Sequence, residues 1–106
     1  MDREIELKGI FHLLATGGRT LPMYKGYMGV CNIKGTSNRQ DSFAIHLPQD
    51  KLELGESCPA SISFLFSYHT QFGLKFKESD VLEMHEGNRK IGQFYISEIV
   101  SEKLRR

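Results

Sequence analysis

The chain has 106 residues, with 14 Lys and Arg against 13 Asp and Glu, which gives a formal net charge of +1. This length fits one domain, residues 1–106, and leaves no room for a second folded unit. A near-neutral charge provides no overall field to attract nucleic acid or an anionic membrane, so such binding would need a local patch. Leu, Ile, Val and Phe make up about 27% of the residues, which is enough apolar surface for a packed core.

Two cysteines, Cys31 and Cys58, are too few for a disulfide framework and lack the ligand spacing of a zinc site. The N-terminal residues lead into an alternating segment without the apolar stretch of a secretory signal. The longest stretch without charged residues, 57–74, contains too many polar residues for a membrane-spanning helix. We therefore expect a cytoplasmic protein with no membrane span.

Apolar and polar residues alternate at the start of the chain. Ile5, Leu7, Phe11 and Leu13 fall on odd positions, whereas polar residues occupy most even positions. This period of two indicates a half-buried β-strand, because a helix would need apolar residues at three- and four-residue spacing. Similar but in part less regular patterns, bounded by turn residues, predict five further strands. The six predicted strands are residues 4–13, 28–34, 43–47, 60–68, 80–85 and 90–99.

The dipeptide Gly87–Asn88 separates the last two predicted strands and is typical of a tight hairpin turn with positive φ. Two helical alternatives exist in this part of the chain, a short helix over 79–86 and one helical turn over 97–104. The first is disfavoured because about twelve residues are needed before propensity alone sustains a helix. Short strands at roughly ten-residue spacing indicate an all-β sandwich or closed barrel.

The pattern does not bring catalytic groups together. His12 and His46 fall on outward strand positions, and the neighbours His85 and Glu86 point to opposite faces of one strand. A nucleophile elbow is missing, and the segment Gly17–Thr20 lacks the spacing and the lysine of a nucleotide-binding loop, so we interpret it as a turn. Calcium-loop spacing is also missing. We predict a protein that is not an enzyme and needs no metal, nucleotide or other cofactor.

Large aromatic residues occupy one face of the fourth predicted strand, namely Phe64, Phe66 and Tyr68. They could stack on single-stranded RNA, with Lys75 and Lys77 supplying positive charge. Core packing is the favoured interpretation, because a small barrel must be filled by large side chains. Replacing Phe64 or Phe66 with Ala would then cost about 3–5 kcal/mol.

Three motifs follow one another along the chain. The first, Gly17–Tyr27, reads GGRTLPMYKGY; the second combines Ala44–Pro48 with the turn Leu54–Glu56; the third, His85–Gly92, reads HEGNRKIG. In this order they resemble the third, C-terminal β-barrel domain of translation elongation factor Tu. The resemblance spans nearly the whole chain and implies that domain's fold, a six-stranded antiparallel closed Greek-key barrel. The residues that carry it in the first motif are Gly17, Gly18, Arg19, Pro22, Lys25, Gly26 and Tyr27.

In that family the third barrel holds the T-stem side of aminoacyl-tRNA through backbone phosphates and sugars, and it contacts the GTPase domain and the exchange factor. A glutamine and an arginine of the family's tRNA surface are replaced here by Val30 and His85. The resemblance therefore implies a partly retained surface for RNA or another partner. Its residues are Lys34, His85, Glu86, Gly87, Arg89 and Lys90.

Retained barrel motifs, a near-neutral charge and an altered tRNA surface favour a non-catalytic protein-binding module with an aromatic or apolar contact patch. The P-loop of the family's GTPase domain is missing from this sequence, so we do not expect GTP hydrolysis. The alternative function is a translation-related module that grips tRNA or another structured RNA by its backbone, with weak and salt-sensitive affinity.

Overall fold

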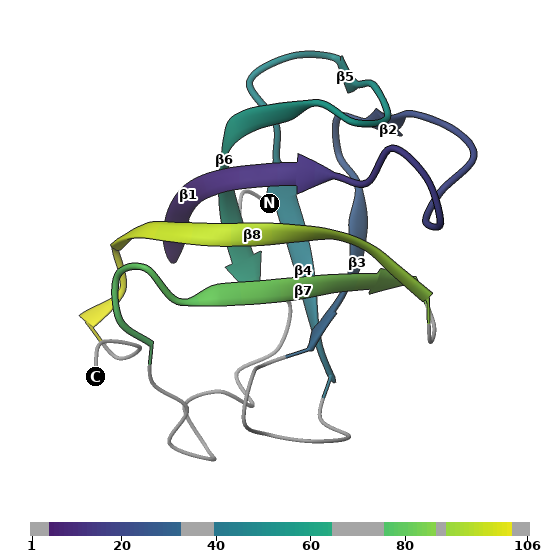
Figure 1. Cartoon of the computed structure of the whole chain (residues 1–106). Helices are drawn as coiled ribbons and strands as arrows, with labels where there is room; N and C mark the ends of the chain where they lie inside the picture. Colours follow the sequence, from purple (N-terminus) through teal and green to yellow (C-terminus); the bar gives the residue numbers. More distant parts are fainter. Residues whose placement is uncertain (1–4, 33–39, 65–75, 87–88, 103–106) are drawn as a thin grey trace.

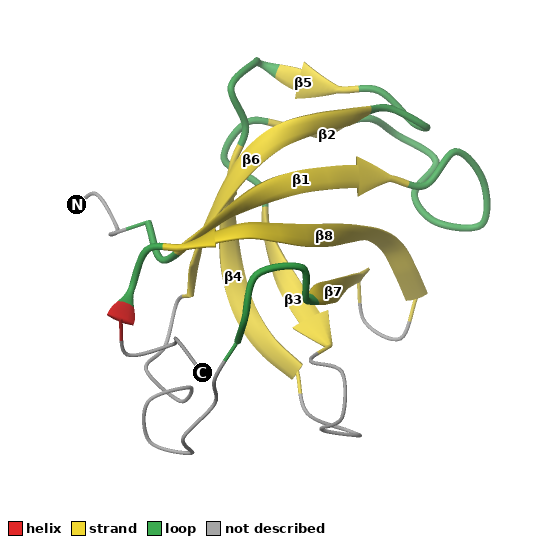
Figure 2. Ribbon diagram, turned by 60° about the vertical axis from the view of Figure 1, so that its left-hand side comes forward, coloured by secondary structure: helices red, strands yellow, loops and turns green. Residues whose placement is uncertain are grey.

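The computed structural model describes residues 5–32, 40–64, 76–86 and 89–102. Within them, six antiparallel strands form a barrel in the order β1-β6-β4-β3-β7-β8, and pairing between β1 and β8 joins the two ends of the sheet (Figure 1). A separate two-stranded sheet, β2–β5, lies beyond one end of the barrel (Figure 2). The strands are β1 Leu7–Leu13, β2 Met23–Tyr24, β3 Met28–Asn32, β4 Gln40–His46, β5 Lys51–Leu52, β6 Ser57–Phe64, β7 Val81–Glu86 and β8 Arg89–Ile99.

The six barrel strands correspond to the six strands predicted from alternation, which confirms the all-β prediction. In β1, Leu7, Phe11 and Leu13 are fully buried, whereas Lys8 and Ile10 are exposed. The strands β2 and β5 were not predicted, because two residues are too few to show a period. The inward side chains of the barrel strands fill one continuous core, which also includes Phe76 from the segment before β7.

Strand β6 departs from simple alternation at Ser63. Ile62 and Phe64 are buried as expected, but Ser63 between them is also fully buried, and its Oγ lies 2.9 Å from His46 Nε2. The ring of Phe64 stacks on Phe76, with centroids 6.1 Å apart and planes inclined by 5°. This supports core packing at Phe64, while Phe66, Tyr68 and Lys75 lie outside the described residues.

Antiparallel pairing of β7 with β8, up to the partners Glu86 and Arg89, confirms the predicted hairpin, although Gly87 and Asn88 themselves are outside the described residues. Strand replaces both helical alternatives over half or more of their described residues. Residues 81–86 form β7, and β8 continues through Ile99, so a helical turn does not begin at Ser97. Helical geometry within 97–102 is confined to Glu102, which is a 3₁₀ residue. Within these segments, residues 81–86 and the end of β8 pair with neighbouring strands, which satisfies their backbone groups without a helix. Within the described ranges, no helix is long and apolar enough to cross a bilayer.

Candidate functional site

The first and third sequence motifs meet at one end of the barrel in a polar cluster of Arg19, Tyr27 and Glu86. Arg19 Nη1 donates a hydrogen bond to Glu86 Oε2, and the Tyr27 hydroxyl donates to the same oxygen over 2.6 Å. The Arg19 guanidinium carbon lies 5.2 Å from the centre of the Tyr27 ring, within the range of a cation–π contact. The Arg19–Tyr27–Glu86 cluster therefore joins the loop before β2, the turn between β2 and β3, and the end of β7.

Arg19 also fixes the loop from which it comes. Its Nε donates to the carbonyl of Leu21 over 3.1 Å, and Nη2 donates to the carbonyl of Pro22 over 3.0 Å. Pro22 restricts the backbone of Leu21 to extended conformations. One guanidinium thus holds two successive carbonyls of its own loop and a carboxylate that lies 67 positions further along the chain.

The Lys-Gly-Tyr part of the first motif forms a tight turn between β2 and β3. The Tyr27 N–H donates to the Tyr24 carbonyl over 3.2 Å, and Gly26 has a φ of +91°, which is the conformation that the third residue of a type II turn requires. The N–H of Lys25 donates to the Asp50 carbonyl over 2.8 Å and ties the turn to the region before β5. This geometry delivers the Tyr27 side chain to Glu86.

The cluster favours a neutral Tyr27 hydroxyl that donates to a charged carboxylate. Burial, together with the hydrogen bond to Glu86 and its negative charge, raises the pKa of Tyr27 far above its usual value, although Arg19 acts in the opposite direction. A phenol that is this difficult to deprotonate is a poor base or nucleophile near neutral pH. The arrangement suits holding the end of the barrel together.

The residues of the predicted surface for RNA or another partner differ in how far their side chains are engaged within the barrel. Glu86 is engaged with Arg19 and Tyr27, and the His85 side chain is only 12% exposed, with Nε2 3.3 Å from Glu83 Oε1. The other ring nitrogen of His85, Nδ1, is buried without a hydrogen-bond partner in the described part of the chain. Lys34 and Gly87 lie outside the described residues.

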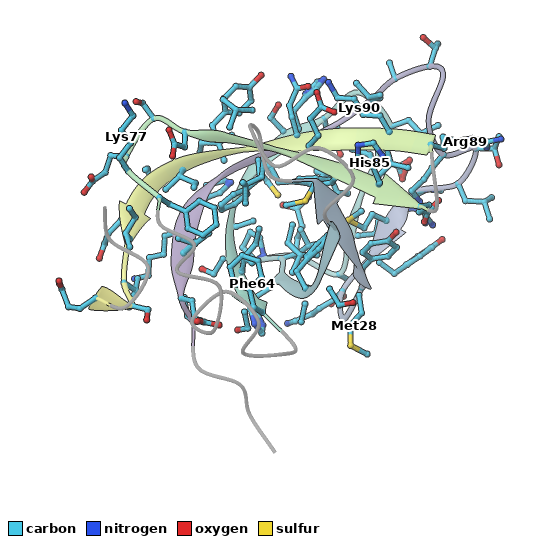
Figure 3. The ribbon with its side chains drawn as sticks, turned by 90° about the horizontal axis from the view of Figure 1, so that it is seen from below. Met28, Phe64, Lys77, His85, Arg89 and Lys90 are labelled. Atoms are coloured by element: carbon cyan, nitrogen blue, oxygen red, sulfur yellow. The ribbon has the colours of Figure 1, made fainter. Side chains whose placement is uncertain are left out.

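The remaining two cations of that surface come from β8. Figure 3 shows Arg89 and Lys90 on the same side of the barrel as His85. Arg89 Nη1 lies at 3.5 Å from the Gly18 carbonyl, and Lys90 Nζ lies 3.8 Å from Glu83 Oε2. Glu83 thus offsets part of the positive charge, which reduces the attraction of this side for a phosphate backbone.

An apolar feature of the same region was not identified as a contact surface from the sequence. Leu21, Tyr24 and Met28 are exposed to 64%, 57% and 60%, the largest values among the large apolar residues of the described ranges. Met28 points away from the barrel in Figure 3. We call residues 21–28 the 21–28 segment. Its sequence could have signalled this feature, because Leu21 and Tyr24 flank Pro22 and the turn glycine.

Two histidine–serine pairs lie within hydrogen-bond distance in the described residues. His46 Nε2 lies 2.9 Å from Ser63 Oγ, but Ser63 is fully buried and cannot reach a substrate. His12 Nδ1 lies 2.8 Å from Ser57 Oγ near the surface, and no carboxylate of the described residues contacts that imidazole. Both pairs therefore lack the arrangement that activates a serine. Clusters of three or more metal-ligating side chains are also missing from the part of the chain that the structure describes.

The two sequence motifs are thus joined by a hydrogen-bonded cluster beside an exposed apolar segment. The relation to elongation factor Tu stays a prediction from the motifs quoted above. Comparison of this sequence with protein-family models and with curated proteins finds no match.

Proposed function

We propose that this chain is a non-catalytic binding module whose partner is a protein and whose contact surface is the 21–28 segment. The observation that carries the proposal is the exposure of Leu21, Tyr24 and Met28, each by more than half, within eight residues. Exposed apolar and aromatic side chains on a rigid backbone are typical of contact residues. Their removal from water on binding is favourable, and little conformational entropy is lost because the segment is already ordered.

Rigid support of this segment strengthens the proposal. Arg19 fixes the backbone at Leu21 and Pro22, and the Tyr24–Tyr27 turn is fixed by its internal hydrogen bond and by Asp50. A partner would therefore meet a segment whose shape is already set, which lowers the entropy cost of association.

RNA is the weaker candidate because Glu83 offsets part of the positive charge on the β7–β8 side. Arg89 and Lys90 are the arginine and the lysine of the predicted surface that lie within the described residues, and Glu83 is close to Lys90. Few net phosphate contacts would give weak binding that is lost at moderate salt.

The proposal also includes the type of barrel and the location of the protein in the cell. We assign the barrel to the Greek-key type of the elongation factor Tu C-terminal domain, with the sequence motifs and the antiparallel barrel order as its support. A cytoplasmic location is supported by Cys58, which is a buried free thiol.

The test is affinity capture from a lysate with and without RNase, using tagged wild type, the Leu21→Ser/Tyr24→Ser variant and a control variant. Wild type should capture a protein both with and without RNase, and the Leu21→Ser/Tyr24→Ser variant should lose it. Val100→Ser is the matched control, because Val100 is exposed to 40% outside the 21–28 segment, and it should retain that protein. Equal thermal unfolding midpoints would show that all three proteins are folded.

Arg89→Ala/Lys90→Ala serves as the RNA arm of this experiment. The contrary outcome is that wild type captures an RNA that the Arg89→Ala/Lys90→Ala variant does not, and no protein whose capture depends on Leu21 and Tyr24. This outcome would replace the proposed function by RNA binding. A captured protein that both serine variants retain would remove the 21–28 segment as the contact surface.

A further inference from the structure

A second exposed apolar feature lies on the outside of the barrel wall. Ile10 of β1 is directly opposite Pro59 of β6 on one side and Tyr95 of β8 on the other, and Tyr95 is opposite Val81 of β7. Cross-strand partners have Cβ atoms about 4.5–5.5 Å apart, so these four side chains form a continuous line across four strands. We call Val81, Tyr95, Ile10 and Pro59 the outer apolar row.

The outer apolar row faces away from the core. Ile10 and Tyr95 are each exposed to 41%, and Pro59 is exposed, although their chain neighbours in β1, β8 and β6 are mostly buried. The Tyr95 hydroxyl accepts a hydrogen bond from Gln93 Nε2, which fixes the ring on this face. Four adjacent apolar side chains on an outer strand surface are unusual, because such positions are normally polar.

Polar residues flank the row along both sides. Beyond one side lies His12, with its cross-strand partners Ser57 on β6 and Gln93 on β8. Beyond the other side lie Lys8 and Glu98, which are also direct cross-strand partners. An apolar centre with a polar rim is the usual anatomy of a protein interface.

Lys8 and Glu98 carry information about the occupant. Both side chains are exposed, and although they face each other across β1 and β8, neither forms an ion pair with any of the described residues. The positive charge of Lys8 and the negative charge of Glu98 therefore lie side by side on the outer surface. A partner could pair with both if it placed a negative charge against Lys8 and a positive charge against Glu98.

A second copy of this chain meets that condition. Two copies can be placed with the outer faces of their β1 and β8 strands in contact, related by a two-fold axis that lies between the copies and runs parallel to these strands. This axis places Ile10 against Tyr95 of the second copy and Lys8 against Glu98 of the second copy, and symmetry repeats both contacts. A groove of about 490 Å³ next to the row, lined by residues that include Lys8, Ile10, Pro48 and Pro59, provides room for side chains of the second copy.

From this complementarity we infer that the outer apolar row is the interface of a symmetric homodimer. This inference goes beyond the proposed function, because it concerns a different surface from the 21–28 segment. The dimer closes on itself, so both copies keep their 21–28 segments for another protein.

Sedimentation equilibrium of the whole chain over a concentration series tests the inference. The average mass of wild type should rise from 12.1 kDa towards that of two chains. Lys8→Glu and Glu98→Lys should each weaken association about tenfold, because two favourable pairs per dimer become repulsive. The double variant Lys8→Glu/Glu98→Lys should regain the wild-type dissociation constant, since the charges are exchanged rather than lost.

Lys51→Glu makes the same charge change at an exposed lysine outside the row and should leave association unchanged, and Tyr95→Ser should weaken it. A chain of constant 12.1 kDa mass over the whole series would overturn the inference, and so would a dimer that is indifferent to Tyr95→Ser. Failure of the double variant to recover, with thermal unfolding like that of wild type, would also overturn it. None of these outcomes affects the proposed function, whose test depends on Leu21 and Tyr24.

Discussion

The wall of the barrel and the Arg19–Tyr27–Glu86 cluster at its end are held together by different kinds of interaction. The wall encloses a core of apolar side chains that alternate along each strand, such as Leu7, Phe11 and Leu13. The cluster consists of polar groups separated by 59 and 67 positions in the chain. The wall is therefore specified by a local pattern, whereas the cluster exists only after the barrel has brought β3, β7 and the 17–22 loop together.

The two regions should also differ in how much stability they contribute. Apolar burial in the wall removes whole side chains from water, and each large residue contributes several kilocalories per mole. The cluster is only partly buried, with 16% of the Arg19 side chain and 37% of the Glu86 side chain exposed. These groups form hydrogen bonds to water in the unfolded chain, so the net contribution of the cluster to the free energy of unfolding is smaller than that of the core.

The largest expected effect is the loss of a core aromatic residue from the wall. Phe64→Ala should lower the free energy of unfolding by about 3–5 kcal/mol, because it removes the ring that stacks on Phe76 and leaves a cavity. Urea unfolding monitored by circular dichroism measures this change. Phe64→Leu is the control and should lose much less, because it keeps most of the volume. A loss below about 1 kcal/mol for the Ala variant would show that the Phe64 side of β6 is not core.

The cluster gives the next effect. Glu86→Ala should destabilise the chain by about 1–3 kcal/mol, because Arg19 and the Tyr27 hydroxyl both lose their acceptor. A double-mutant cycle with Arg19→Ala should give a coupling of about 0.5–3 kcal/mol. Glu83→Ala, at a largely exposed carboxylate of the same strand, is the control. Additive effects of Arg19→Ala and Glu86→Ala would mean that the contact between them adds no stability.

This difference explains how much of the molecule could be predicted from its sequence. All six barrel strands follow from local alternation and turn residues, and the β7–β8 hairpin follows from Gly87–Asn88. The two-residue strands β2 and β5 could not be found, because they arise where the chain crosses the end of the barrel. Burial of Ser63 was also beyond prediction, since it depends on His46, which lies 17 positions away.

The candidate site was only half predictable for the same reason. The motifs identified Arg19, Tyr27 and Glu86 as individual positions, and Glu86 was predicted to belong to a surface for RNA or another partner. Its carboxylate is engaged with the other two residues, a pairing that sequence spacing does not reveal. The exposure of Leu21, Tyr24 and Met28 depends on which loop face the barrel leaves uncovered.

A smaller effect tests the protonation state inside the cluster. Tyr27→Phe removes one hydrogen-bond donor but keeps the ring, so near neutral pH it should cost about 1 kcal/mol. Because the pKa of Tyr27 is raised in the folded chain, the unfolded chain loses this proton first, from a pH of about 10. The free energy of unfolding of wild type should therefore fall above that pH, and Tyr27→Phe should lack this part of the decline.

Chemical unfolding of both proteins between pH 8 and about 11 measures the difference. Titration of the other tyrosines and of the lysines is common to both proteins and cancels when their free energies are subtracted. The advantage of wild type should narrow as the pH rises. An advantage that grows with pH would mean that the Tyr27 hydroxyl is not the donor to Glu86.

The smallest effect on stability is expected for substitutions in the 21–28 segment. Its exposed side chains should then matter for binding a partner but not for folding. Leu21→Ser and Tyr24→Ser should each change the free energy of unfolding by no more than about 0.5 kcal/mol, because both side chains are mostly exposed. The supporting contacts of this segment are made by backbone carbonyls and by Arg19, which neither substitution removes. Urea unfolding midpoints of the two variants, compared with that of Phe64→Ala, provide the measurement. A loss above about 1.5 kcal/mol for either variant would place that side chain among the packed residues of the barrel end and withdraw it from the proposed contact surface.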